Sequence, residues 1–320
     1  MKNVATILVS GSFPDRLNTN AGLRGAVVRG LQECLPAGAV RECRFELAAE
    51  HVAAVRPDVL LLVGSCYLDV LRYDELRVAC KRSGTLLAFW LHDDPYEFDA
   101  HYRVAEVADI IFTSDRWAAR HYAHPRVYHL PLAADPAVHR RPADGRRYLD
   151  LFFCGMAFPN RVNLLRDLAP RLARRNVSVH GEGWPEDLKF CRNQRLPAAQ
   201  VADLSAASLL TLNVGRHLDL ANRRFQLPAS TPGPRTFEAA MAGAVQLVFV
   251  ESLEILDYFE PDEEVLLFDN PADAVRLLEE LRRDHRRAAR IGGAAQRRAL
   301  AEHTYAHRAR QLLKAVNASR

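Results

Sequence analysis

The chain has 320 residues, 49% of them hydrophobic and 26% charged, and a formal net charge of +4 at pH 7. This length suffices for two ordinary domains, and the composition is that of a soluble globular protein rather than a disordered or fibrous one. The longest apolar runs, such as residues 58–64, are far too short to span a membrane.

The first residues, MKNVATILVSGS, carry one lysine and a short apolar run, but no full signal-peptide core and no clean cleavage site. We therefore expect them to form a first β-strand. The six cysteines are scattered and include no Cys-x-x-Cys pair, which favours reduced thiols over a disulfide framework or a zinc site. Together these features predict a cytoplasmic protein.

Up to residue 130, apolar runs alternate with amphipathic stretches of helical spacing. The predicted strands are residues 4–10, 58–64, 85–91, 109–114 and 126–130, and the predicted helices include residues 22–35 and 70–82. This alternation, with strands that are apolar almost throughout, is typical of a parallel sheet covered on both faces. Residues 10–26 join the first strand to the first helix and are predicted to supply a polar, glycine-containing loop at the cleft; an ordinary loop is the alternative.

His92, Asp93 and Asp94 directly follow the predicted strand 85–91. Because ligands bind beyond the carboxyl ends of parallel strands, these three residues are predicted to be catalytic or to bind an acceptor. A structural cap is the alternative. A metal site with ligands from His92, Asp93, Asp99 and His101 is a further alternative, but the spacing matches no standard metal motif, and we predict no metal.

The pattern breaks at residues 131–148, which hold three prolines, a glycine and four arginines and are predicted to be an inter-domain linker. A second strand–helix series follows. Its predicted strands are residues 148–155, 177–181, 209–215 and 263–269, and its predicted helices include 161–175 and 198–208. The predicted fold class is therefore α/β, with two Rossmann-like doubly wound domains facing a cleft.

Three turns of this second domain are predicted to contact a ligand. Gly155 allows close approach after a strand, and Arg161 could neutralise a leaving pyrophosphate; an ordinary strand-to-helix turn is the alternative. The backbone near Gly183 and Trp184 could hold a nucleobase, although Trp184 could equally be a rim or core aromatic. Asn213 ends another predicted strand on the same side of the sheet.

The segment STPGPRTFEAAMAG, residues 230–243, predicts a short helix with an anion site at its start. Gly233 or Thr231 can cap the helix, and Pro234 suits its first position. The N–H groups of the next three residues would then point outward without internal partners, where phosphate is the usual guest. These three residues are Arg235, Thr236 and Phe237.

Glu238 follows Arg235 by three positions, so the two side chains should share a helix face. A carboxylate beside a phosphate would repel it, and Glu238 is better explained as an acceptor for ribose hydroxyl groups slightly further away. The alternative is a salt-bridged helix start without a ligand. The C-terminal block 282–311 is rich in arginine, which predicts either a solvated helix face or a landing surface for an anionic partner.

The ordered set of these segments resembles group-1 glycosyltransferases of the GT-B fold, in particular their spore-maturation, CgeB-type branch. RTFEAAMAG followed by an apolar strand is similar to the donor-binding segment of this family. VYHLPLAADPAVHRR resembles the end of the family's first domain, and DLFFCGMAFPNRVNLL and SVHGEGW resemble the opening strands of its second. EHTYAHRARQLL resembles its last helix, which returns to the first domain.

The resemblance implies that Glu238 holds the ribose and that Arg235 and Thr236 lie near the pyrophosphate. It places the loop containing Gly11, Ser12 and Asn20 near donor phosphates and acceptor. Many group-1 enzymes carry a glutamate eight positions before the ribose-binding one, whereas this sequence has Ser230 there. The implied domains are an acceptor-side domain at 1–140, a nucleotide-sugar-binding domain at 141–300 and a returning helix at 301–320.

We therefore expect a glycosyltransferase that moves a sugar from a nucleotide sugar to an acceptor, which could be a glycan, a protein or a small molecule. We expect no cofactor, no metal and retention of anomeric configuration. Two alternatives stay open on the sequence: a GT-B-fold sugar-nucleotide epimerase or hydrolase, and a non-catalytic nucleotide-sugar-binding protein.

Overall fold

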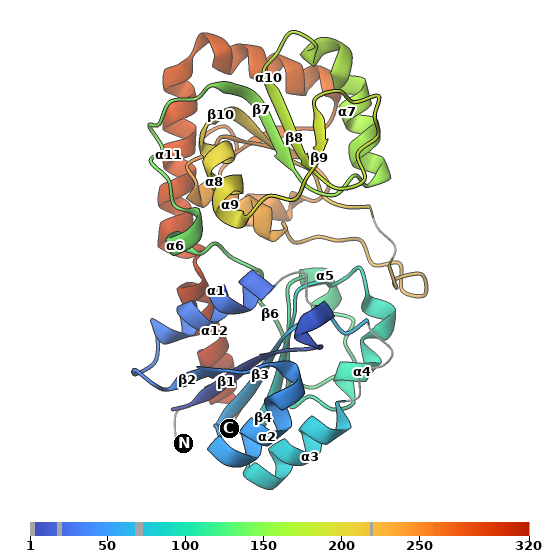
Figure 1. Cartoon of the computed structure of the whole chain (residues 1–320), viewed down its shortest axis with the longest axis vertical. Coiled ribbons are helices and arrows are strands. Elements are labelled where there is room, and N and C mark those ends of the chain that lie inside the picture. The colour runs from blue at the N-terminus through green and yellow to red at the C-terminus, as the bar shows by residue number, and fades with distance from the viewer. Residues whose placement is uncertain (1–3, 18–20, 68–72, 218–219, 320) are drawn as a thin grey trace. The chain divides into compact units, whose positions relative to one another are not determined.

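The computed structural model describes residues 4–17, 21–67, 73–217 and 220–319. The chain divides into two compact units, each with one six-stranded sheet (Figure 1). Unit 1 comprises Met1–Leu132, Asp219–Thr231 and Tyr305–Arg320, and unit 2 comprises Ala133–Leu218 and Pro232–Thr304.

The sheet of unit 1 is parallel throughout, in the order β2-β1-β3-β4-β5-β6. Its strands are β1 (Ile7–Gly11), β2 (Val40–Glu42), β3 (Val59–Gly64), β4 (Leu86–Leu91), β5 (Ile110–Thr113) and β6 (Val127–His129). Five of the six were predicted from their apolar runs. The edge strand β2 was missed because it is three residues long and exposes Arg41 and Glu42.

The helices of unit 1 connect successive strands, except for the last one. They are α1 (Ala21–Gln32), α2 (Ala48–Val55), α3 (Asp74–Ser83), α4 (Tyr102–Ala105), α5 (Arg116–Ala119) and α12 (Tyr305–Ala318). α12 comes from the C-terminus and packs on α1, where a Cβ on Gly30 would lie 2.4 Å from the carbonyl carbon of Tyr305. The Arg308 guanidinium also donates to the Pro131 carbonyl oxygen at 2.9 Å.

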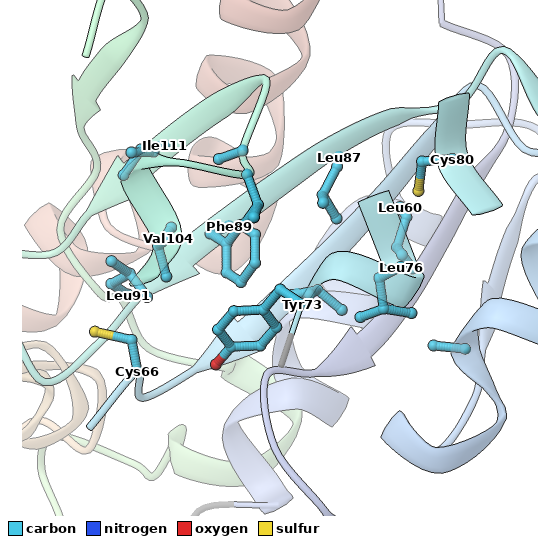
Figure 2. Close-up of a cluster of buried hydrophobic side chains, with 14 of the residues drawn as sticks. Leu60, Cys66, Tyr73, Leu76, Cys80, Leu87, Phe89, Leu91, Val104 and Ile111 are labelled. Atoms are coloured by element: carbon cyan, nitrogen blue, oxygen red, sulfur yellow. The ribbon is translucent and has the colours of Figure 1, made fainter. Parts of the chain in front are cut away.

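One core cluster of unit 1 is built from alternate residues of β3 and β4 against α2 and α3. Figure 2 shows Tyr73 and Phe89 in this cluster together with Leu60, Leu76 and Leu87. The Tyr73 and Phe89 rings meet edge to face, with centroids 5.0 Å apart, a favourable aromatic geometry. The Tyr73 hydroxyl donates to the Ser12 carbonyl oxygen at 2.9 Å, which ties the loop after β1 to this core.

Residues 220–231 belong to unit 1, although a single boundary near residue 140 would place them in the second domain. Two aspartates explain this placement. The Asp99 carboxylate accepts backbone N–H groups of Arg223, Arg224 and Phe225, and the Asp115 carboxylate accepts those of Ser230 and Thr231. The chain thus returns to unit 1 once before entering α9.

The sheet of unit 2 is also parallel throughout, in the order β12-β11-β10-β7-β8-β9. Its strands are β7 (Leu149–Cys154), β8 (Val177–Gly181), β9 (Cys191–Asn193), β10 (Ser208–Asn213), β11 (Gln246–Phe249) and β12 (Leu266–Phe268). The helices are α6 (Pro136–His139), α7 (Pro159–Leu172), α8 (Ala198–Ala206), α9 (Pro234–Met241), α10 (Pro271–Arg283) and α11 (His285–Glu302).

Successive residues of β7 pack into different cores of unit 2, as the twofold alternation of a strand requires. Leu151 and Phe153 join the cluster that contains α7 and α10, whereas Phe152, which lies between them, packs against Val201 of α8. The sheet is therefore covered on both faces, which leaves its strand ends as the place for polar groups.

All six cysteines are free thiols. None of the helices in the described ranges combines the length and the hydropathy that a membrane span needs.

Candidate functional site

The helix α9 begins where the local sequence predicts. Gly233 occupies the N-cap position with an extended backbone, and Pro234 is the first helical residue. Thr231, the other predicted cap, does not cap the helix. Its hydroxyl instead accepts the backbone N–H of Arg116 at 2.9 Å and lies 3.0 Å from His129 Nε2, within unit 1.

Arg235 and Glu238 share one face of α9, as their spacing predicts. The Arg235 guanidinium donates to Glu238 Oε2 at 2.7 Å. The side chain of Arg235 is 37% exposed and that of Glu238 is 18% exposed. A carboxylate and a guanidinium are thus oriented by each other near the start of a helix, and both keep contact with solvent.

Thr236 points inward rather than toward solvent. It is 2% exposed, and its hydroxyl accepts from Asn213 Nδ2 at 2.7 Å. The same amide group donates to Gln246 Oε1 at 3.2 Å. The backbone N–H of Thr236 donates to the Gly233 carbonyl oxygen at 3.1 Å, so the prediction that this N–H has no internal partner is wrong. Asn213 and Thr236 are brought together and support the first turn from beneath.

Phe237 is fully buried. Its ring packs edge to face on Tyr258, with centroids 5.4 Å apart, and lies near Phe259 and His303. The side chain anchors α9 in the core of unit 2, so only its backbone lies in the turn that was predicted to bind an anion.

The turn after β7 contains Gly155 and Arg161, and the two residues depend on each other. A Cβ on Gly155 would lie 2.8 Å from Arg161 Nη1. The guanidinium donates to the carbonyl oxygens of Val214, Gly215 and Met156 at 2.8, 3.0 and 3.1 Å. Arg161 therefore fastens the β7–α7 turn to the end of β10, and its role of neutralising a pyrophosphate stays a prediction.

The GEGW turn after β8 differs from its prediction. Gly183 has a φ of +82° and so requires the left-handed region. Trp184 is a core residue, 3% exposed, and its ring meets Phe153 edge to face. Its backbone N–H and carbonyl are both bonded to the Asn193 side chain, at 2.7 and 2.9 Å. These two backbone groups are therefore not offered to a nucleobase, contrary to the prediction.

His139 lies beside Glu238 and was missed by the sequence reasoning. Its Nε2 is 3.8 Å from Glu238 Oε1. Burial lowers the pKa of His139, while the Glu238 charge opposes that shift and the Arg235 charge adds to it. The signal that could have found it is the spacing Asp-Pro-x-x-His, in which Asp135 caps α6 and α6 carries the histidine at its end.

Glu251 was also missed. It follows β11, and its carboxylate lies so close to Gly215 that a Cβ there would sit 1.7 Å from Oε2. Burial raises the pKa of Glu251, and the charges of His217 and Arg161 oppose the shift. The turns after β7, β10 and β11 are thus joined by polar contacts at the carboxyl ends of these strands.

In unit 1, His92 and Asp93 lie at the carboxyl end of β4. His92 Nε2 is 3.0 Å from Asp93 Oδ2, and the two side chains are 7% and 21% exposed. The backbone N–H of His92 donates to the Gly64 carbonyl oxygen at 3.2 Å. The structure therefore holds both side chains as a pair at a strand end.

Asp94 differs from its two neighbours because it is 4% exposed. Its Oδ2 accepts from the Thr113 hydroxyl at 2.6 Å and from the Tyr122 hydroxyl at 2.9 Å. Burial raises the pKa of Asp94 to about 7, although the Thr113 hydrogen bond opposes the shift. The predicted catalytic role of Asp94 is corrected: this carboxyl group belongs to the interior of the turn.

Glu97 is a second buried carboxyl group in the same turn. It accepts from the Ser65 hydroxyl and, at 2.7 Å, from the backbone N–H of Cys66. Burial and the charge of Asp93 raise the pKa of Glu97. These contacts tie the turn after β4 to the turn after β3.

The remaining polar residues proposed for unit 1 are engaged within the fold. Asp99 binds the backbone of residues 223–225, and His101 Nδ1 lies 2.8 Å from the Phe98 carbonyl oxygen. Within the described ranges, no group of three or more His, Cys, Asp or Glu side chains is arranged to hold a metal ion. The four-residue alternative of His92, Asp93, Asp99 and His101 is therefore not assembled.

The loop after β1 offers fewer polar groups to a ligand than the sequence predicted. Ser12 is buried, and its hydroxyl donates to the Ser65 carbonyl oxygen at 2.6 Å. Gly11 ends β1, and a Cβ there would lie 3.2 Å from Arg24 Nη1. Asn20 lies outside the described residues.

Three arginines of the C-terminal block form ion pairs with acidic residues of unit 2, as does Arg276 just before the block. Arg276 and Arg287 both contact Glu280, Arg282 contacts Asp150, and Arg298 contacts Glu302. This pattern fits a solvated helix face.

Residues 161–314 match a family model described as glycosyl transferase-like. No curated protein matches the sequence. Among solved structures, Anabaena HepE in complex with UDP and glucose is 12% identical, with a TM-score of 0.66 over 97% of this chain and 98% of HepE. AviGT4, a glycosyltransferase involved in avilamycin A biosynthesis, is 16% identical, with a TM-score of 0.63 over 98% of this chain and 97% of AviGT4.

A Listeria monocytogenes protein provisionally described as a UDP-N-acetylglucosamine 2-epimerase shares the fold as well. It is 13% identical, with a TM-score of 0.59 over 98% of this chain and 96% of that one. Likeness at these identities establishes architecture and not activity. The predicted fold is confirmed: the chain has the two-unit α/β fold of GT-B glycosyltransferases, and its glycosyl transferase-like segment contains all of α9.

Proposed function

We propose that this protein is a glycosyltransferase that transfers a sugar from a nucleotide sugar to an acceptor hydroxyl group, without a metal. The observation that carries the proposal is the Arg235–Glu238 pair in the first two turns of α9. It lies within the segment that matches the glycosyl transferase-like model, on a fold shared with a protein whose structure holds UDP. We also assign the chain to the CgeB-type branch, on the order of its motifs along the sequence.

In this proposal the start of α9 binds the diphosphate of the donor. A helix N-terminus favours anions through its N–H groups and its dipole. Arg235 adds a charged guanidinium that is already oriented. Glu238 accepts hydrogen bonds from the ribose hydroxyl groups, and its bond to Arg235 limits repulsion between its charge and the phosphates. Gly155 and Gly183 allow close approach of the ligand at the ends of β7 and β8.

In the reaction, the bond between the anomeric carbon and the diphosphate oxygen breaks, and the diphosphate leaves with the electron pair. A bond forms between the anomeric carbon and the acceptor oxygen, and the acceptor proton passes to the departing diphosphate. We propose retention of configuration, with His92 and Asp93 contacting the transferred sugar or the acceptor. The charge on the departing diphosphate is stabilised by Arg235 and the helix N-terminus.

The test begins with ligand binding. Thermal shift and calorimetry with UDP, GDP and ADP identify the nucleotide, because a ligand specific for the folded state raises the melting temperature. Turnover of the matching sugar nucleotides is then measured with and without candidate acceptors and in excess chelator. Transfer that persists in chelator supports the proposal.

Three outcomes would replace the proposal. Complete and metal-reversible loss of activity in chelator would make the enzyme metal-dependent. Donor turnover without any acceptor would identify an epimerase or hydrolase. Binding of a nucleotide sugar without turnover of any donor would indicate a binding protein.

A further inference from the structure

His139 has a defined protonation pattern because of the way α6 begins. Its Nδ1 lies 3.1 Å from both the backbone nitrogen and the carbonyl oxygen of Asp135. That oxygen already accepts the backbone N–H groups of Val138 and His139, at 3.1 and 2.9 Å. Nδ1 is therefore best satisfied as an acceptor for the Asp135 N–H, which leaves the ring proton on Nε2.

The Nε2 atom of His139 faces Glu238. It is buried and forms no hydrogen bond with another described residue, and it lies 3.8 Å from Glu238 Oε1. That distance is too long for a hydrogen bond but short enough that a small shift would close it. Buried polar atoms are normally paired, so an N–H directed at a carboxylate calls for an explanation.

The Glu238 carboxylate therefore lies between two donors from different elements. Arg235 of α9 holds Oε2, and His139 of α6 faces Oε1. The imidazole is almost completely enclosed, with its side chain 8% exposed, whereas Glu238 keeps contact with solvent. A ligand at this site would reach Glu238 without touching His139.

We propose that His139 is a positioning residue: its Nε2–H fixes the Glu238 carboxylate in the orientation that receives two neighbouring hydroxyl groups of a ligand. This inference rests on the proposed function, in which those hydroxyl groups belong to the ribose of a nucleotide. His139 thereby adds selectivity for a ribose over a sugar that lacks the two hydroxyl groups.

Three charged groups act on the imidazole. Burial lowers the pKa of His139, the Glu238 and Asp135 charges raise it, and the Arg235 charge lowers it. The net direction is downward, so the ring is neutral at pH 7. Protonation at lower pH would place a proton on Nδ1, opposite the Asp135 N–H, and would disturb the arrangement.

The first experiment measures the affinities of UDP and its 2′,3′-dideoxy analogue by calorimetry. His139→Phe keeps a ring of similar size but removes the Nε2–H, and His139→Gln restores an N–H near the same position. We expect His139→Phe to weaken UDP binding about tenfold and to leave the dideoxy analogue unchanged. His139→Gln should recover most of the loss, and His139→Phe should add nothing in a Glu238→Gln background. Equal weakening of both ligands by His139→Phe would overturn the proposal.

The second experiment needs no ligand. Ring ¹⁵N shifts of His139 report which nitrogen carries the proton, and we expect Nε2. Because the Glu238 charge raises the pKa of His139, Glu238→Gln should lower that pKa. A proton on Nδ1, or a pKa unchanged in Glu238→Gln, would overturn the proposal. If the wild-type protein binds no nucleotide, the proposed function fails, while the ¹⁵N data still decide whether His139 and Glu238 are coupled.

Discussion

Carboxyl groups lie directly beside the apolar core in two places in this molecule. They are buried in one place and remain in contact with solvent in the other. In the turn after β4 of unit 1, Asp94 and Glu97 are 4% and 0% exposed and accept hydrogen bonds from neighbouring turns. At the start of α9 in unit 2, Glu238 is 18% exposed and is bound by Arg235, which is 37% exposed.

The difference follows from the cost of burying charge. A carboxylate taken out of water either finds a cation or becomes easier to protonate. Asp94 and Glu97 have hydroxyl and N–H donors, but no cation among the described residues lies within hydrogen-bonding distance of them, and burial raises the pKa of both. Glu238 has a guanidinium at 2.7 Å and partial solvation. The buried carboxyl groups in the turn after β4 thus support the fold, whereas the start of α9 retains charged groups that a ligand can contact.

The largest expected effect comes from disturbing the glycine turn that shapes the strand ends of unit 2. A Cβ on Gly181 would lie 1.8 Å from the Gly155 carbonyl oxygen, at a φ of +145°. Gly181→Ala should therefore lower the free energy of unfolding by about 4 kcal/mol or more. Urea denaturation measures this value.

Gly183→Ala is the matched control in the same turn. Its φ is +82°, but the nearest atom to the added Cβ would be 3.6 Å away. Only backbone strain remains, and the expected loss is about 1–2 kcal/mol. Equal losses in the two variants would show that the contact with Gly155 does not matter.

The second prediction tests whether the buried carboxyl group of Asp94 is protonated in the folded chain. Its pKa is raised to about 7 in the folded chain, against 3.8 for the ordinary carboxyl group of the unfolded chain. The folded chain therefore holds this proton more tightly, so its stabilising contribution is complete below about pH 4 and is lost as the pH rises toward 7. Asp94→Asn keeps a neutral side chain at every pH.

The free energy of unfolding of the wild type should fall by roughly 3–4 kcal/mol relative to Asp94→Asn between pH 4 and pH 8. Denaturant titrations at several pH values follow this difference. Parallel pH profiles for the two proteins would mean that Asp94 titrates normally and that the contrast between the two turns is wrong.

The third prediction distinguishes the role of Asp93 in the turn after β4 from the roles of its buried neighbours. Asp93 is 21% exposed and pairs with His92. Under the proposed function, Asp93→Asn should lower turnover about 100-fold, the usual scale for the loss of one such group. Nucleotide affinity should stay near that of the wild type. Full turnover in this variant would leave the whole turn with a structural role.

The smallest of these effects concerns Glu238. Under the proposed function, Glu238→Ala should weaken nucleoside diphosphate binding by about 1.5–3 kcal/mol, the range for hydrogen bonds to a charged group. The fold should persist, because the side chain is partly exposed. Asp273→Ala is a matched control, since Asp273 forms an ion pair with Arg276 three residues away in the first turn of α10. Equal affinities in the wild type and Glu238→Ala would remove Glu238 from the site.

The architecture followed from the sequence because long apolar runs and helical spacing are local signals. The strands β3, β4 and β10 could be placed within about two residues, whereas β2 could not, since it is short and half exposed. The return of residues 220–231 to unit 1 could not be predicted either. It depends on two aspartates that bind backbone N–H groups far away in the sequence.

The sequence predicted which residues belong to the candidate site, but it did not predict where their side chains point or what they bind. The i, i+3 spacing was enough to pair Arg235 with Glu238. Nothing in the spacing shows that the guanidinium of Arg161 is bound by carbonyl oxygens, or that Trp184 is bonded to Asn193. His139 was missed because its contact with Glu238 joins positions 99 residues apart, which only the folded chain reveals.

The central claim is that the first turn of α9 binds the nucleotide. Amide hydrogen exchange with and without saturating UDP or UDP-glucose tests it most directly, because exchange reports local protection of the backbone. The account predicts slower exchange at residues 235–238 and in the β7–α7 turn, and less protection in Glu238→Ala at a ligand concentration that just saturates the wild type. Protection confined to other segments, or unchanged exchange with every nucleotide tested, would contradict it.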